Sequence, residues 1–385
     1  MTRKLLLLFL VLVLAIPLSP ALAGPPQTPP STAVNPLTGL PVNDAASLSL
    51  PPALVSISNF PVSARPQAGL SYAPIVYELY IGEGMTRYLA IFYGDYPSQA
   101  TTASGSQPAT KQAAQDASQA ATAQAATIGP IRSGRVSYEK IRKLYNGFLV
   151  MASAYKSVAQ SLSQYTNFFG SDGSSVNSAL IPVERLEEIA KSTGKQLDTT
   201  ALSGMAFDKL APSGKNAQVL WLPFSFKNQV FWRYDSESGA YHRYQDNADA
   251  RTYTEITDRL TGEPLAFENV VVLFAEHERI SSTIFDLNLS YIDRAPALLF
   301  RDGQVYNIFW TTANGDYEKE TGHLRPIRFV DAQGKPFPLK PGQTWIETVT
   351  PASTVYESID AQNWYDLKTK KQPGSGVWVV NFKAP

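Results

Sequence analysis

Cysteine is absent from the 385 residues, and histidine occurs only three times. Without a thiol the chain has no disulfide bond and no thiolate nucleophile, so a cysteine transpeptidase is excluded. His242, His277 and His323 all lie in the second half, and no two of them have zinc-ligand spacing. No G-x-S-x-G motif, phosphate loop or dinucleotide fingerprint occurs. The sequence therefore disfavours a Ser-His-Asp triad and predicts neither a metal nor a cofactor.

An excess of charge of either sign is also lacking, since 33 basic residues face 33 acidic ones. This balance argues against a nucleic-acid partner and against a membrane-surface protein. The longest apolar run, Leu5–Ile16, has 12 residues, which is shorter than the roughly 20 that span a bilayer. Arg3 and Lys4 precede the run, and Ala21-Leu22-Ala23 follows it as a cleavage site.

Residues 1–23 are therefore predicted to be a signal peptide, with an uncleaved anchor as the alternative. We expect an extracytoplasmic protein, either secreted or associated with the cell envelope, with no transmembrane helix after cleavage. Residues 24–34 contain four prolines and are predicted to form an extended spacer. This spacer would hold the folded part of the chain away from the membrane or wall.

The remaining chain predicts an α+β protein with two domains. Residues 35–209 indicate an α/β domain with a mixed sheet, and residues 210–350 indicate a β-rich domain. The tract 98–126 is rich in Ala, Ser, Thr and Gln without an apolar stripe, so we expect a disordered insertion. Residues 351–385 are expected to be an extension with one strand, Val377–Phe382, added at a sheet edge.

The first domain contains two strands and two helices that are well marked. Strands are predicted at Ile75–Ile81 and Thr86–Tyr93, joined by a glycine-rich turn. A helix is predicted where Tyr138, Ile141, Leu144 and Tyr145 recur at helical spacing, and a second over Val183–Ser192. Short strands at Leu54–Ser58 and Gly147–Ala154 flank the first helix, which suggests a parallel βαβ crossover.

Arginines gather around the junction between the Gly129-Pro130 loop and the first helix. Arg132, Ser133 and Arg135 lie at the junction itself, and Arg65 and Arg87 are expected at the same end of the sheet. A helix start with free N–H groups and guanidinium forks nearby is suited to an anion. We interpret these five residues as candidate ligand-binding residues.

A carboxylate pair provides the alternative chemistry. Glu78 lies on the first strand, and Glu83 lies in the turn that follows it. Two carboxyl groups roughly 5–10 Å apart are what a glycoside hydrolase needs. These acids are weak catalytic candidates, because ion pairs with the neighbouring arginines explain them as well.

Several stretches resemble the YerB-like bacterial lipoprotein family, whose two domains have no established biochemical function. They are NPLTGL, ARPQAGL, APIVYE, GMTRYLAIF and IGPIRSGR in the first domain, and FWRYDSESGAYHRY, NVVVLF, LLFRDGQVYNIFW and GKPFPLKPGQTWIETV in the second. Together they extend over most of residues 35–350. The resemblance implies a two-domain envelope protein with a break near residue 210.

The chain departs from this family pattern in two places. Ala23-Gly24 stands where relatives carry a lipid-bearing cysteine, and MASAYKSV and NSALIPVE replace histidine- and glycine-containing stretches. The arginines persist, so we favour a non-catalytic binding or accessory module for an anionic wall component. The alternatives are a carboxylate-dependent hydrolase or transferase acting on a wall glycan, and a scaffold for an envelope protein that binds through the last strand.

Overall fold

The computed structural model describes residues 33–96, 127–167, 179–359 and 371–385. The predicted signal peptide, most of the spacer and the whole of the 98–126 tract lie outside these residues. Within the described ranges, no helix is long and apolar enough to cross a membrane. All the described residues belong to one compact unit.

Among the described residues, eleven strands form one large mixed sheet that joins the two halves of the chain. The link is β2 (Ile75–Gly82), which pairs in parallel with β20 (Thr344–Val349) from the second half. In spatial order the other strands are β19 (Arg328–Val330), β18 (Gln304–Thr311), β17 (Ala295–Arg301) and β14 (Asn269–Phe274) on the β20 side, and β3 (Met85–Phe92), β1 (Ala53–Ser58), β5 (Phe148–Met151) and β6 (Tyr165–Asn167) on the β2 side, with β8 (Lys215–Asn216) beside β18.

The strands and helices predicted for the first half are confirmed to within a few residues. The β2–β3 hairpin turns at Gly82, Glu83 and Gly84, all with positive φ, which explains the two glycines. Strand β1 pairs in parallel with β5, as expected of a crossover through α3 (Ser137–Tyr145). The remaining helices are α4 (Lys156–Ala159), α5 (Val183–Ser192) and α6 (Asp316–Thr321), with 3-10 turns η1 (Ala45–Ser49), η2 (Val62–Ala64), η3 (Leu70–Tyr72) and η4 (Thr199–Leu202).

A second sheet contains seven of the described strands. Its order is β12 (Tyr253–Glu255), β11 (Ala240–Asp246), β10 (Asn228–Asp235), β9 (Val219–Ser225), β22 (Val377–Asn381) and β21 (Thr354–Glu357), with β13 (Ala266–Phe267) beside β11. The predicted edge position of the last strand is wrong, because β22 lies between β9 and β21. The extension contributes β21 as a second strand, and β22 offers no free edge to a scaffold partner.

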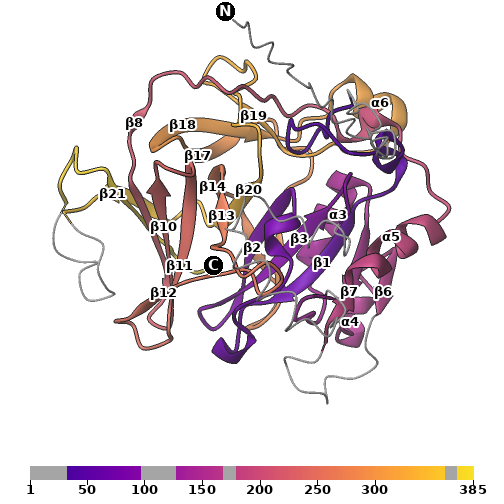
Figure 1. Cartoon of the computed structure of the whole chain (residues 1–385), viewed down its shortest axis with the longest axis horizontal. Helices are drawn as coiled ribbons and strands as arrows, with labels where there is room; N and C mark the ends of the chain where they lie inside the picture. Colours follow the sequence, from indigo (N-terminus) through magenta and orange to yellow (C-terminus); the bar gives the residue numbers. More distant parts are fainter. Residues whose placement is uncertain (1–32, 97–126, 168–178, 360–370) are drawn as a thin grey trace, which may run out of the picture. The chain divides into compact units, whose positions relative to one another are not determined.

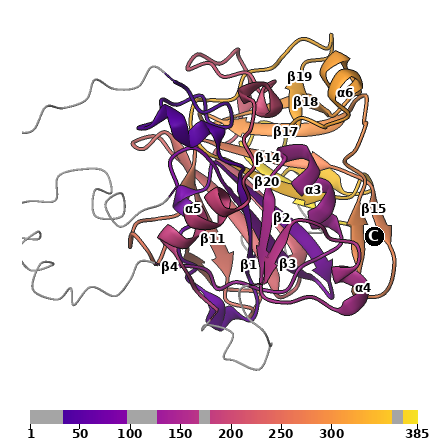
Figure 2. The same cartoon turned by 90° about the vertical axis from the view of Figure 1, so that its right-hand side faces the viewer.

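Both faces of the large sheet are covered. One face packs against the seven-stranded sheet and α5, and the other packs against α3. In Figure 1 the labels of β10, β11 and β12 lie to the left of β1, β2 and β3, with α3 and α5 to the right; Figure 2 shows the two helices from the side. Two further strand pairs complete the described fold: β4 (Thr127–Ile128) with β7 (Ile181–Pro182), and β15 (His277–Arg279) with β16 (Phe285–Leu287).

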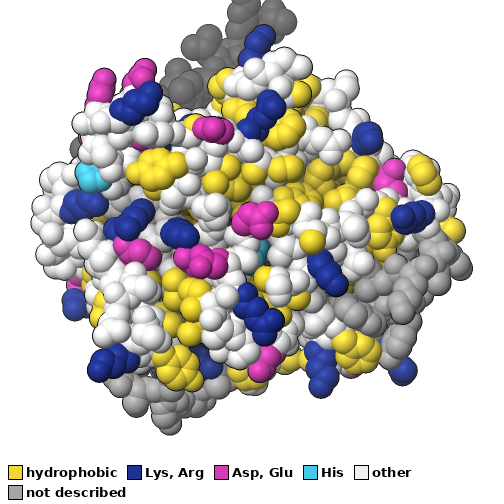
Figure 3. Space-filling view, turned by 180° about the vertical axis from the view of Figure 1, so that it is seen from behind, with side chains coloured by type: hydrophobic (Ala, Val, Ile, Leu, Met, Phe, Trp, Pro, Cys, Tyr) yellow, Lys and Arg dark blue, Asp and Glu magenta, His cyan; other side chains and the backbone are white. Residues whose placement is uncertain are grey.

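The balanced charge of the sequence is visible on the surface. Figure 3 shows acidic and basic side chains close to one another on one face, with hydrophobic side chains between them. On this face, as in the sequence, charges of the two signs are interspersed.

A buried carboxylate fastens the two halves together. Asp258, from the second half, is 1% exposed. Its Oδ1 accepts a hydrogen bond from the Gly69 amide at 2.7 Å, and its Oδ2 accepts from the Ser71 amide at 2.8 Å and hydroxyl at 2.7 Å. Hydrogen bonds to an enclosed charged acceptor are stronger than those between neutral groups. This contact therefore stabilises the packing of the second half of the chain against the first.

Replacing Asp258 by alanine is expected to lower the free energy of unfolding by about 2–3 kcal/mol, because buried donors of the 69–71 turn lose their acceptor. Urea unfolding followed by tryptophan fluorescence measures the loss. Asp249→Ala is the matched control, since Asp249 accepts similar hydrogen bonds from Thr252 but is exposed. Equal losses in the two variants would contradict the fastening role of Asp258.

Candidate functional site

A pocket of about 530 Å³ lies outside the carboxyl ends of three strands that run in the same direction, β1, β2 and β5. In open α/β sheets this end is where ligands are usually bound. We call it the arginine pocket, and its described lining residues are Phe60, Pro61, Ile81, Glu83, Met85, Arg87, Arg132, Arg135, Tyr155, Val158, Thr283 and Ile284. Three of the five predicted ligand-binding residues therefore line one cavity.

The loop that carries the pocket's arginines is fixed through its backbone. The Arg132 amide donates to Ser56 O of β1 at 2.9 Å, and its carbonyl accepts from the Ala152 amide after β5 at 3.0 Å. A Cβ on Gly134 would collide with the Met151 sulfur, so glycine allows the loop to approach β5 closely. The arginine side chains therefore project from a segment tied to two strand ends.

The three arginines of the pocket are held differently. Arg87 is 5% exposed and donates from Nη1 to the Ser133 carbonyl at 2.8 Å. Arg135 donates from Nη1 to the Gly134 carbonyl at 2.9 Å. The Arg132 side chain has no hydrogen bond or ion pair with another described residue, and its Nε is enclosed. Of the three, Arg132 is the one whose side chain the described fold leaves available for a ligand.

The other two predicted binding residues, Ser133 and Arg65, contact residues that line the pocket. Ser133 contributes its carbonyl oxygen, which accepts from Arg87. Arg65 donates from Nε to the Asn59 side chain at 3.1 Å and from Nη1 to Asp246 O at 2.7 Å. Its guanidinium lies 4.8 Å from the centre of the Phe60 ring, which is part of the pocket wall. Neither residue is among the described residues that line the cavity.

The two glutamates predicted as a catalytic pair are placed in different environments. Glu83 borders the arginine pocket at the β2–β3 turn. Glu78 is 0% exposed and accepts from Arg243 at 2.7 Å and from the Thr86 hydroxyl at 2.6 Å. The structure therefore presents one of them to the pocket and encloses the other between the sheets.

The enclosed cluster around Glu78 was not predicted from the sequence. Glu347 lies opposite Glu78 in the β2–β20 pairing, and Arg243 of β11 contacts both, with Nη1 at 3.2 Å from Glu347. Arg243 and both glutamates are 0% exposed. Burial, and next the neighbouring Glu78 carboxylate, raise the pKa of Glu347 well above its ordinary value. This shift favours the neutral form of Glu347 beside the Glu78–Arg243 ion pair.

Aromatic rings surround the buried guanidinium. Trp345, Trp232 and Tyr88 have ring centres 4.4, 5.1 and 5.4 Å from the Arg243 carbon. The Trp232 indole also donates to Glu347 at 2.8 Å. The alternation of aromatic and charged residues in FWRYDSESGAYHRY and in TWIETV was the signal available for this cluster.

The apolar part of the arginine pocket was also missed. Tyr155 is 78% exposed beside it, and Thr283 and Ile284 come from the connection between β15 and β16. No motif marks this connection, because it comes from the second half and meets the pocket only in the folded chain. Three guanidinium groups, one carboxylate and an apolar wall suit a negatively charged ligand with an apolar or ring portion.

Metal binding has no comparable support in the described ranges, where no three His, Asp or Glu side chains form a candidate ligand group. The arginine pocket instead presents guanidinium groups. These are permanently charged and recognise carboxylates and phosphates through paired donors.

Comparison with known proteins places the chain in a two-domain family. Residues 37–204 match the family described as "Protein of unknown function (DUF3048) N-terminal domain", and residues 220–346 match its C-terminal domain. The chain belongs to this family, and the resemblance seen in its motifs is confirmed. The arginine pocket combines residues from the N-terminal match with two from the C-terminal match.

A relative and a solved structure support the same assignment. The protein of Bacillus subtilis (strain 168) named "Putative lipoprotein YerB" is 27% identical over 331 residues, covering 82% of this chain and 85% of the relative. The crystal structure of YerB from Bacillus subtilis matches with a TM-score of 0.61 at 25% identity, covering 83% of this chain and 97% of that chain.

Proposed function

We propose that the chain is an exported cell-envelope protein that binds an anionic envelope component in the arginine pocket, without catalysing a reaction on it. The observation that carries the proposal is the pocket's charge: Arg87, Arg132 and Arg135 line it, and Glu83 is the only acid among its described lining residues. Guanidinium groups gathered in one pocket attract an anion, and the Arg132 side chain forms no hydrogen bond or ion pair with another described residue.

The envelope location is supported from two sides. The predicted signal peptide of residues 1–23 and the spacer of residues 24–34 are typical of exported proteins. The Bacillus subtilis relative is named a lipoprotein, which is a class held at the outer face of a membrane. This chain has Ala23-Gly24 in place of a lipid-bearing cysteine, so we propose that it is secreted or held by its signal segment.

Binding is favoured over glycan hydrolysis by the placement of the acids. A hydrolase of the carboxylate type needs two carboxyl groups facing the same bond. Glu78 is fully buried and forms an ion pair with Arg243, whereas Glu83 alone reaches the pocket. A single acid beside three arginines favours retention of an anion more than its cleavage.

The test is isothermal titration of the full chain with glycerol 3-phosphate and with muramyl dipeptide, which supply a phosphate and a carboxylate. Arg132→Ala is expected to weaken binding of the preferred anion by about 10–100-fold, the equivalent of one charge-assisted contact of about 1.5–3 kcal/mol. Because the Arg132 side chain bonds to no other described residue, the melting temperature should stay nearly unchanged.

Arg185→Ala is the matched control, because it removes the same charge from the exposed face of α5. It should leave the affinity unchanged. An affinity that is the same in wild type, Arg132→Ala and Arg185→Ala would overturn the proposal, as would the absence of binding to either anion.

A further inference from the structure

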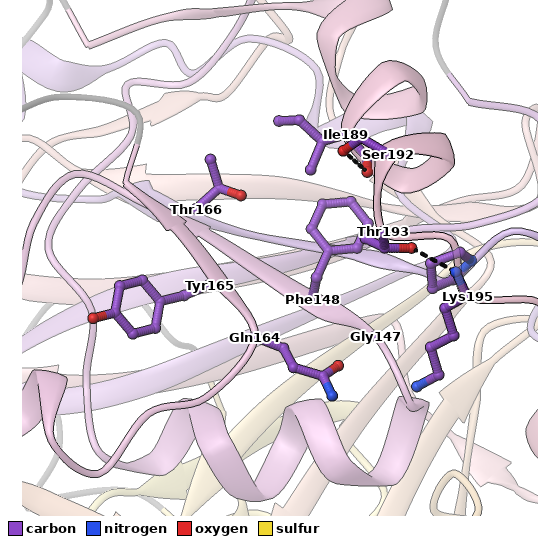
Figure 4. Close-up of a pocket in the computed structure, with 10 residues that line it drawn as sticks. Gly147, Phe148, Gln164, Tyr165, Thr166, Ile189, Ser192, Thr193 and Lys195 are labelled. Atoms are coloured by element: carbon purple, nitrogen blue, oxygen red, sulfur yellow. Dashed lines mark hydrogen bonds between the residues drawn. The ribbon is translucent and has the colours of Figure 1, made fainter.

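Two smaller cavities adjoin at the other end of α3. One, of about 380 Å³, lies between the start of β5, strand β6 and the end of α5; the other, of about 300 Å³, lies beside the end of α3. They share Gln164 and Lys195, so we describe them together as the lysine groove. Figure 4 shows the first cavity, with the Tyr165 ring and the Lys195 side chain on opposite sides.

The lysine groove is basic. Arg142, Lys143, Lys195 and His323 contribute to its described lining, which contains no aspartate or glutamate. Arg142 is already bound on two sides by Glu139, at 2.8 and 3.0 Å. Lys143 is 58% exposed and its closest acid, Glu139, is 3.8 Å away. A ligand entering the groove therefore meets amines that its described lining does not neutralise.

Lys195 lines both cavities of the lysine groove. Its amine donates to the Asn146 carbonyl at 2.6 Å and has no carboxylate partner among the described residues. Burial, and next the nearby Arg142, lower the pKa of Lys195. A bound anion would relieve both effects, because it supplies the missing opposite charge.

Rings and amides accompany these charges. Tyr291 is 55% exposed and Tyr165 is 39% exposed, and the Gln164 amide lies between the two cavities. Exposed tyrosine faces stack on flat or ring-shaped ligand groups while their hydroxyls remain in water. Because the two cavities share Gln164 and Lys195, a ligand that occupies both must be extended.

Helix α3 connects the lysine groove to the arginine pocket. Its nine residues span about 13 Å. Only Lys140 and Lys143 of this helix are not buried, and they lie on one face at i, i+3 spacing. The surface between the two sites is therefore lined by lysines, although Lys140 also pairs with Asp286 at 2.9 Å.

We propose that the lysine groove is a second anion site, and that one linear polyanion occupies both it and the arginine pocket by lying along α3. This inference rests on the proposed function for one of its two contacts. Linking two modest sites through one polymer raises affinity by a factor of about 10²–10⁴ when both are engaged at once. The ligand class is thus a repeating polyphosphate ester or polyuronate, and not a single small anion.

The test compares titration of the full chain with a glycerol phosphate dimer and with an oligomer of about ten units, and repeats it with galacturonate oligomers of matched length. The long form of the matching chemistry is expected to bind at least about tenfold more tightly than its short form. Lys195→Ala should remove this advantage while leaving the short form's affinity unchanged. If Tyr291 stacks on a sugar ring, Tyr291→Ala should weaken the binding of galacturonate oligomers more than the binding of glycerol phosphate oligomers.

Lys143→Ala provides a second variant that keeps the Lys195–Asn146 hydrogen bond, and it should weaken the long form alone by severalfold. Lys227→Ala is the control, because this lysine is exposed on the β9–β10 turn of the other sheet. The inference is overturned if long and short forms bind equally, or if Lys195→Ala and Lys143→Ala both bind the long form as wild type does. If these variants lose binding while Arg132→Ala binds as wild type does, the proposed role of the arginine pocket as an anion site is contradicted.

Discussion

Replacing Arg243 by alanine is expected to lower the free energy of unfolding by about 3–5 kcal/mol, the cost of leaving a buried charge without its partner. Arg243 and Glu78 are both 0% exposed and 2.7 Å apart. Without the guanidinium, the Glu78 carboxylate must either remain charged between two sheets or take up a proton. Both outcomes cost stability, and the space left among three aromatic rings adds to the loss.

Equilibrium unfolding in guanidinium chloride measures this effect. Arg233→Ala is the matched control on the neighbouring strand, because Arg233 is exposed and faces the other side of the sheet. The Arg233→Ala variant should lose no more than about 0.5 kcal/mol of its free energy of unfolding. The double variant Arg243→Ala, Glu78→Gln should lose less than the sum of the single variants, since the unpaired charge is gone. Strict additivity would mean that the pair is not coupled.

The arginine pocket was largely predictable because its arginines come from segments close to strand ends. Arg87 lies at the start of β3 beside the β2–β3 turn, and Arg132 lies in the loop before α3, so the order strand, helix, strand places both at the same end of the sheet. Arg65 does not line the cavity, and its contact with the Asp246 carbonyl could not be predicted because Asp246 is 181 residues away in the sequence.

The joining of the halves was not predictable from local pattern. Strand β2 pairs with β20 about 270 residues later, and both strands read locally as ordinary buried strands. Periodicity reports which residues are buried but not which partner buries them. For the same reason the sequence suggested ion pairs between Glu78 and the neighbouring arginines, whereas its partner is Arg243 from the second sheet.

Acidification is expected to weaken the fold through His277. Burial lowers the pKa of His277 from about 6.5 to about 4, because its Nε2 is enclosed without a hydrogen-bond partner among the described residues. Its Nδ1 is 2.8 Å from the Ala275 carbonyl, which suits a neutral ring donating from that nitrogen.

The sign of the effect follows from the two pKa values. Between pH 6.5 and pH 4 the unfolded chain holds a proton on His277 and the folded chain does not, so the unfolded state binds more protons. The free energy of unfolding therefore falls as the pH falls through this window, by about 3.5 kcal/mol in total at about 1.4 kcal/mol per pKa unit. More than about one pH unit above 6.5 or below 4, this residue adds no further dependence.

Asp246 acts in the opposite direction over part of the same range, because burial raises its pKa to about 6. The pH profile of the wild type alone is therefore not diagnostic, and the difference between wild type and His277→Asn is the quantity to measure. Asparagine keeps a donor near Ala275 O but does not titrate. Unfolding curves at intervals from pH 7 to pH 4 should show wild type losing its advantage over the variant as the pH falls. Parallel profiles would show that His277 is protonated in the folded protein as readily as in the unfolded chain.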